Sequence, residues 1–185
     1  MAWIKVIDKT DESTELGKIF SEIEKKRGKL SNILKVHSLK PSTMQAHLHL
    51  YLAIMFNKSK LKRELKEMIA VVISRLNGCQ YCVNHHAEAL RHFWKDNNRL
   101  TRFIDDFESV QLPEEVKLVL LYAKKLTLDP IAVVKKDISV LRKAGYWDEE
   151  ILEINLVVSY FNFVNRIANG LGVHFSDEEM VGYKY

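Results

Sequence analysis

Apolar side chains recur with the period of an α-helix along most of this sequence. Leu16, Ile19, Phe20 and Ile23 lie three or four positions apart, which predicts an amphipathic helix that ends near Gly28. The same period continues through the second half of the chain. Only residues 1–9 have a short alternating pattern, which predicts an extended arm or a small edge strand. We therefore predict an all-α helical bundle, with further helices over residues 31–39, 42–56, 61–76, 80–94, 99–107, 113–128, 134–145 and 148–170.

Segment 61–76 is apolar on nearly all sides, which is typical of a helix buried in a core. Gly78 follows it and can end it in the left-handed conformation that glycine adopts at low cost. The chain then turns at once into the helix predicted for 80–94. These two helices are therefore expected to be neighbours, joined at the turn around Gly78.

Length and composition indicate one domain over residues 1–185, with an extended arm at 1–9 and a C-terminal tail at 176–185. The net charge of +4 comes from mixed-sign runs rather than a basic block, so we predict no nucleic-acid partner. No apolar run approaches the ~18 residues of a membrane span, and the start lacks the pattern of a signal peptide. We therefore predict a cytoplasmic protein without a membrane partner. We also predict that it uses no cofactor.

The candidate chemistry lies in the turn around Gly78. Cys79 and Cys82 are the only cysteines of the chain, and His86 follows the second after four residues. The first turn of a helix favours a thiolate, and spacing of three and four places both sulfurs and the imidazole on one face. Glu67, on the preceding helix, is expected to be partly buried with a raised pKa, which would suit it to act as a base. His85 points away from this face.

Several interpretations of the cysteine pair stay open at this point. Zinc would find three ligands in Cys79, Cys82 and His86, but no second cysteine pair supplies a fourth, and we predict no resident metal. Two inert buried thiols are also compatible with the pattern. A c-type haem would need histidine where Val83 stands, and a thioredoxin fold would need strands, so both are excluded.

The four residues Glu67, Cys79, Cys82 and His86 resemble the Glu…Cys-x-x-Cys-x-x-x-His pattern of the AhpD-like alkylhydroperoxidase family, within the carboxymuconolactone decarboxylase superfamily. The similarity extends over nearly the whole chain and is closest to an uncharacterised peroxidase-related branch, through residues 77–82, 121–127 and 160–173. The resemblance implies an all-α AhpD-like bundle and a homo-oligomer, as a dimer, trimer or hexamer. It also implies thiol peroxidase activity with a hydroperoxide substrate and an external dithiol reductant.

Carried over to this chain, the resemblance makes Cys82 the peroxidatic cysteine, Cys79 the resolving cysteine, and Glu67 and His86 a proton relay. The spacing agrees, since His86 is four residues from Cys82 and seven from Cys79, and Cys79 at the helix tip is expected to meet the reductant more freely. Tyr81 stands where well-studied members have a relay histidine, which makes it a candidate for the relay or the pocket.

Polar residues also interrupt the apolar terminal helix. Asn162 and Arg166 share a face there and are predicted either to hydrogen-bond within the structure or to line the pocket or an oligomer contact. His47 and His49 are assigned no functional role. Two other functions compete with the peroxidase: a non-enzymatic redox-sensing or zinc-holding oligomer, and a carboxymuconolactone decarboxylase-like enzyme.

Overall fold

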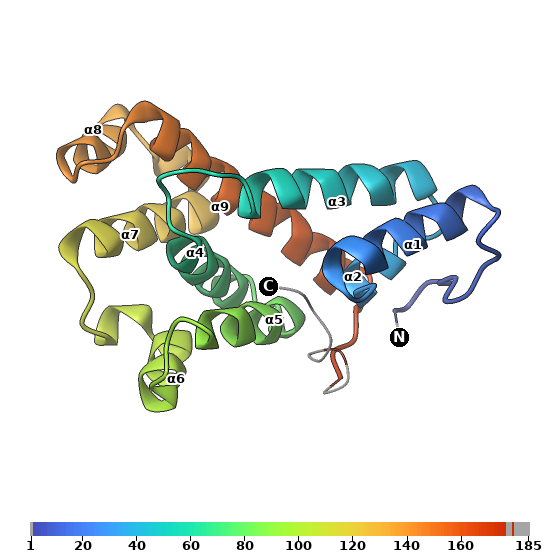
Figure 1. Ribbon diagram of the computed structural model, residues 1–185. Helices are drawn as coiled ribbons and strands as arrows, with labels where there is room; N and C mark the ends of the chain where they lie inside the picture. The colour runs from blue at the N-terminus through green and yellow to red at the C-terminus, as the bar shows by residue number, and fades with distance from the viewer. Residues whose placement is uncertain (1, 177–178, 180–185) are drawn as a thin grey trace.

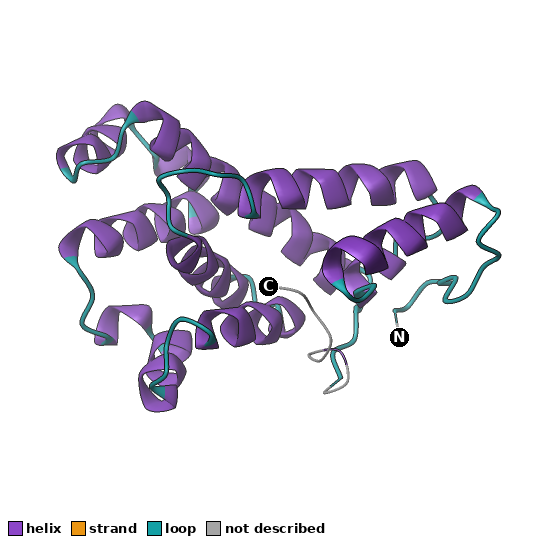
Figure 2. Cartoon of the chain, viewed as in Figure 1, coloured by secondary structure: helices purple, strands orange, loops and turns teal. Residues whose placement is uncertain are grey.

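All regular elements in the part of the chain that the computed structural model describes, residues 2–176 and Glu179, are helical (Figures 1 and 2). The all-α prediction is confirmed, and the predicted helix boundaries agree with those observed to within a few residues. The α-helices are α1 (Glu15–Arg27), α2 (Asn32–Lys35), α3 (Pro41–Met55), α4 (Arg63–Leu76), α5 (Gln80–Arg91), α6 (Asn97–Asp105), α7 (Glu114–Leu128), α8 (Lys135–Lys143) and α9 (Asp148–Gly170); the 3₁₀ turns are η1 (Phe107–Ser109) and η2 (Pro130–Ala132).

Helix α4 is the central element and packs against α5, α7 and α9. It is buried without interruption from Leu65 to Ser74, as its nearly uniform apolar pattern predicts. That stretch includes Lys66 and Glu67, so the most buried helix carries two charged groups into the core. Charged groups at such depth require hydrogen-bonding partners, and those of Glu67 form part of the candidate site.

Among residues 2–176, the apolar interior has two parts. The larger cluster joins α4, α5, α7 and α9. The smaller one lies among α1, α2 and α3 and includes Ile23, Leu34, Met44 and Leu48. Figure 1 shows α1, α2 and α3 beside the C-terminal half of α9, away from α6, α7 and α8. The cavity described below is lined by side chains of both clusters, such as Leu34 and Phe161.

Helix α9, with 23 residues, is the longest helix in the described part of the chain. It carries buried apolar residues together with the buried polar residues Tyr160 and Asn165, and it packs against α3, α4, α5 and α7. Nowhere in residues 2–176 does a helix combine the length and the apolar character that crossing a bilayer would require.

The N-terminal arm contains no strand in its described residues, 2–9. Its Trp3 N–H donates to the carbonyl of Leu171 at 2.8 Å, and its Ile7 N–H donates to the Ser38 hydroxyl at 2.9 Å. The arm is thus attached at both ends to the helical body. Most of the predicted tail at 176–185 lies outside the described residues, which include only Ser176 and Glu179 of it.

Candidate active site

The cysteine pair lies at the turn between α4 and α5. Gly78 has a φ of 64°, the left-handed conformation expected from the sequence, and Cys79 then forms the N-cap of α5. The N–H of Cys79 donates to the carbonyl of Ser74 at 2.8 Å, which fixes the turn. Cys82 follows in the first turn of α5, and the two Sγ atoms of the reduced pair are 3.0 Å apart. The thiols can therefore share a proton, and a small movement would allow a disulfide to form.

The two sulfurs differ from the expectation in both pKa and exposure. The Cys82 thiol lowers the pKa of Cys79, more than burial raises it, and the Cys82 N–H and Asn165 lower it further. The pKa of Cys82 is raised well above its ordinary value by Cys79 and by burial. The first negative charge of the pair thus belongs to Cys79. Cys79 is also 0% exposed, so the expectation that it meets a reductant freely is wrong for this state.

A cavity of about 90 Å³ opens beside the second cysteine. Cys82 belongs to its lining, whereas Cys79 does not. The walls combine aromatic rings, aliphatic side chains and polar groups: Arg27, Lys29, Ser31, Ile33, Leu34, His47, Leu48, Tyr51, Arg63, Tyr81, Cys82, His85, His86, Ala89, Tyr160, Phe161 and Val164. A small molecule in this cavity would therefore meet the sulfur of Cys82 and not that of Cys79.

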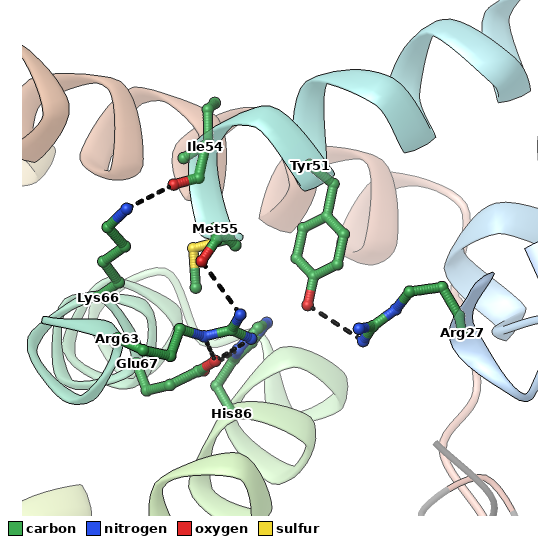
Figure 3. Close-up of polar contacts among 8 residues, drawn as sticks. All are labelled: Arg27, Tyr51, Ile54, Met55, Arg63, Lys66, Glu67 and His86. Carbon is green, nitrogen blue, oxygen red and sulfur yellow. Dashed lines mark hydrogen bonds and ion pairs between the residues drawn. The ribbon is translucent and has the colours of Figure 1, made fainter. Parts of the chain in front are cut away.

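Glu67 is fully buried and receives two cationic or potentially cationic partners (Figure 3). His86 Nδ1 lies 2.6 Å from Oε2, and Arg63 Nε and Nη2 each lie 2.5 Å from Oε1. A carboxylate only accepts hydrogen bonds, so His86 carries a proton on Nδ1 and donates it to Glu67. The other ring nitrogen, Nε2, is left to face the cavity. Figure 3 also shows Lys66 pointing away from this group toward the carbonyl of Ile54.

The pKa of Glu67 is lowered, which is opposite to the expectation. Burial raises the pKa, but His86 and Arg63 together outweigh burial and keep the carboxylate ionised. Glu67 is therefore poorly suited to be the base itself, and it is suited to orient His86. Arg63 was missed by the sequence analysis, although its position four residues before Glu67 is the spacing of a helical ion pair.

Tyr81 lines the cavity but is held by structural contacts. Its hydroxyl donates to Glu179 Oε1 at 2.9 Å and accepts the Ile33 N–H at 3.2 Å. Its ring lies 4.5 Å from that of His85, centroid to centroid. Tyr81 thus connects α5 to the start of α2 and to the C-terminal segment, on the side of α5 that His85 shares.

Asn162 and Arg166 do not line the cavity and instead form hydrogen bonds within the fold. Asn162 Nδ2 donates to the Thr127 hydroxyl at 3.0 Å, and Arg166 Nη1 donates to the Asn162 carbonyl at 2.8 Å. Asn165 on the same helix is the residue near the thiols. Its Nδ2 donates to the Ser74 hydroxyl at 3.1 Å, and its side chain also lowers the pKa of both cysteines.

A second polar group, which the sequence analysis left without a role, lies at the same cavity. His47 is buried, with Nε2 2.8 Å from the Tyr160 hydroxyl and Nδ1 3.0 Å from His37 Nε2. His47 and Tyr160 both line the cavity. Helical spacing places His47 on the apolar face of α3, but that alone does not distinguish a functional histidine from an ordinary core residue.

The described residues contain no group of three His, Cys, Asp or Glu side chains arranged to hold a metal ion. Within that part of the chain, His86 Nδ1 is engaged by Glu67, and the sulfurs face each other.

Comparison with known proteins agrees with this fold. Residues 41–104, which include the four motif residues, match the model of the carboxymuconolactone decarboxylase family. An uncharacterised peroxidase-related protein from Silicibacter sp. TM1040 is 26% identical and superposes with a TM-score of 0.87, over 99% of this chain and 96% of its own. The chain is thus similar to the carboxymuconolactone decarboxylase family over residues 41–104, and its fold is AhpD-like.

Two further structures have the same fold. The AhpD-core, peroxidase-related protein from Ralstonia eutropha JMP134 is 24% identical, with a TM-score of 0.84 over 97% of this chain and 95% of its own. The debrominase Bmp8, solved in complex with 2,3,4-tribromopyrrole, is 21% identical, with a TM-score of 0.77 over 94% of this chain and 91% of its own. The AhpD-like fold that the resemblance implies is thereby confirmed.

Proposed function

We propose that this protein is a thiol-dependent peroxidase that reduces a small organic hydroperoxide with the Cys79–Cys82 pair. The superfamily and the peroxidase-related neighbours support a general alkylhydroperoxidase-like role. The observation that carries the specific proposal is the pair itself: two reduced sulfurs 3.0 Å apart, of which only Cys82 lines a cavity.

The pKa values of the two cysteines fit a scheme in which Cys82 attacks the substrate and Cys79 then completes the disulfide. Cys79 has the lowered pKa but no access to the cavity, whereas Cys82 has access and a raised pKa. Transfer of the shared proton from Cys82 to Cys79 over 3.0 Å makes Cys82 the thiolate. The nucleophile then attacks from the cavity wall, and Cys79 remains the partner with the lower pKa for the second step.

The reaction has two covalent steps. The Cys82 thiolate attacks one peroxide oxygen, an S–O bond forms, the O–O bond breaks, and the alkoxide leaves with a proton as an alcohol. Cys79 then attacks the sulfur of the Cys82 sulfenic acid, a disulfide forms, and hydroxide leaves with a proton as water. An external dithiol returns both cysteines to thiols by exchange. His86, oriented by Glu67, accepts at Nε2 the proton that the pair releases when its first thiolate forms.

Single-turnover reaction with cumene hydroperoxide tests the proposal. The wild-type protein is expected to lose two thiols per hydroperoxide and to form a disulfide. Cys79→Ser should lose its one thiol as a sulfenic acid that dimedone traps, whereas Cys82→Ser should react no faster than a free thiol. The two variants are matched, since each removes one sulfur of the same pair. Rapid oxidation of Cys82→Ser, or no thiol loss in the wild type, would refute the proposal.

A second candidate is reductive dehalogenation of a halogenated aromatic ring. It is favoured by the cavity wall, where the rings of Tyr51, Tyr81, Tyr160 and Phe161 stand around Cys82 and would suit a flat substrate. Two thiols supply the two electrons required: an aryl bromide and two thiols give the arene, a disulfide and hydrogen bromide. Release of bromide from tribromopyrrole with loss of two thiols, together with inertness toward hydroperoxide, would favour this candidate.

The decarboxylase-like alternative makes a different prediction. Such a reaction consumes no thiols, so it would leave the pair reduced after turnover and would survive Cys82→Ser. A redox sensor without catalytic turnover would lose two thiols once and would not consume further hydroperoxide when a dithiol reductant is added.

A further inference from the structure

The proposed peroxidase reaction requires a proton on the side of the substrate away from the thiol. When a thiolate displaces an alkoxide from oxygen, sulfur and the leaving oxygen lie on opposite sides of the oxygen under attack. An alkoxide is a strong base, so the step is slow unless an acid protonates the leaving oxygen as the O–O bond breaks. His86 lies on α5 with Cys82, so it is placed to take the proton that the thiol pair releases. It is not placed to protonate the leaving oxygen, which lies on the far side of the substrate.

Three side chains from outside α4 and α5 form a hydrogen-bonded row that reaches the cavity. Tyr160 on α9 is the first, and its hydroxyl lies 2.8 Å from His47 Nε2 on α3. His47 Nδ1 lies 3.0 Å from Nε2 of His37, in the turn between α2 and α3. The exposed Thr43 hydroxyl lies 3.5 Å from His37 Nδ1. The row thus runs from a cavity wall, through the buried His47, to the half-buried His37 near the surface.

The row can carry a proton only if its imidazoles are neutral, because each must then donate at one nitrogen and accept at the other. Burial lowers the pKa of His37, and burial with the neighbouring His37 lowers that of His47 to about 4. Both rings are therefore neutral near pH 7. If His37 donates to His47 and His47 donates to Tyr160, the phenolic O–H remains available to the cavity.

We propose that Tyr160 is the general acid that protonates the leaving oxygen of the hydroperoxide, and that His47 and His37 resupply its proton from the surface. Tyr160 is a catalytic residue in this scheme, and the two histidines are positioning residues that act through it. The inference rests on the proposed peroxidase function and assigns a residue to a step that the cysteine motif does not provide for.

The proton transfers balance. As the O–O bond breaks, the Tyr160 proton moves to the alkoxide and gives the alcohol. The phenolate takes the proton of His47 Nε2, His47 Nδ1 takes that of His37 Nε2, and His37 Nδ1 takes one from solvent near Thr43. Rotation of the rings or return transfer resets the row. Burial, with smaller contributions from Tyr51 and Cys82, raises the pKa of Tyr160 well above 10, which keeps the phenol protonated until a stronger base such as an alkoxide forms.

The identity of the leaving group tests this assignment. tert-Butyl hydroperoxide expels an alkoxide and needs the acid, whereas peracetic acid expels a carboxylate and does not. The measurement is the single-turnover rate of thiol oxidation by tert-butyl hydroperoxide, divided by the rate with peracetic acid. In Tyr160→Phe this ratio should fall about 10²-fold, the lower range for loss of a general acid. His47→Gln should lower it in the same direction.

Tyr122→Phe is the matched control. Tyr122 and Tyr160 are each 6% exposed, and the Tyr122 hydroxyl accepts a hydrogen bond from Asn155 Nδ2 at 2.9 Å but does not line the cavity. The ratio in Tyr122→Phe should equal that of the wild type. If Tyr160→Phe slows thiol oxidation by both oxidants equally, or if its rate ratio equals that of the control, Tyr160 is structural and the proposal is overturned. A wild-type protein that reacts with neither oxidant would instead overturn the peroxidase function itself.

Discussion

Replacement of Glu67 by glutamine tests the buried contacts that this carboxylate forms with Arg63 and His86. The side chain is 0% exposed, and its two oxygens receive Arg63 and His86 at 2.5 and 2.6 Å. Glutamine has nearly the same shape but only one oxygen. If that oxygen remains with Arg63, the new amide N–H faces His86, and the imidazole must turn or shift its proton from Nδ1 to Nε2. Glu67→Gln should therefore lower both stability and the rate of Cys82 oxidation.

The expected loss of stability is about 3 kcal/mol, at the low end of the 3–5 kcal/mol typical for removing one partner of a buried ion pair. The low end applies because Arg63 is 22% exposed and keeps two other contacts: its Nη1 donates to the Met55 carbonyl at 3.1 Å, and its guanidinium lies 3.8 Å from the centre of the Phe56 ring. At ~2–4 °C per kcal/mol for a chain of this size, Tm should fall by roughly 6–12 °C.

Urea unfolding at neutral pH is the assay, with Glu64→Gln as the control. Glu64 lies on the same helix, and its Oε1 accepts a hydrogen bond from the neutral Trp94 Nε1 at 2.6 Å, which an amide oxygen can replace. The control should lose less than about 1 kcal/mol. Equal unfolding midpoints for the two variants would refute the assignment of a buried ion pair to Glu67.

The difference between wild type and Glu67→Gln should also depend on pH. The pKa of Glu67 is below its ordinary value of 4.5 in the folded protein, so its contribution is present above pH 4.5 and is lost as the pH falls through the folded value. The two unfolding curves should therefore converge in acid. Divergence below pH 4.5 would contradict the sign of this shift.

Three further predictions concern the histidine row, the thiols and the turn. His47 has a pKa of about 4 in the folded protein and 6.5 when unfolded, so the free energy of unfolding should fall by about 3 kcal/mol as the pH falls from 6.5 to 4. His47→Gln should reduce this loss, measured by urea unfolding at a series of pH values. Asn165→Ala should raise the pKa of the first thiol to ionise, as absorbance at 240 nm would show; an unchanged titration would exclude its hydrogen bond to sulfur. Gly78→Ala should cost ~1–2 kcal/mol from its φ of 64° alone, because a Cβ there meets no atom within 4 Å, and Gly78→Asn should cost less; equal losses would contradict this cause.

The sequence by itself determined the helices, the buried character of α4, the turn at Gly78 and the presence of a cysteine pair at a helix start. These are local properties: a 3.6-residue apolar period, a residue without a Cβ, and a spacing of three. The resemblance to the AhpD-like family rests on the same motif, because Glu67 and His86 are at fixed distances along two helices that one turn connects.

Only the tertiary structure decided how the charges are distributed. His86 and Arg63 turn an expected rise in the Glu67 pKa into a decrease, and Cys79 together with burial raises the pKa of Cys82 where the helix start alone predicts a decrease. The cavity on the Cys82 side, and the row from Tyr160 to His37, join residues from α9, α3 and the turn before α3. Such effects depend on distances between groups remote in sequence and on the removal of water around them, and a linear pattern contains neither.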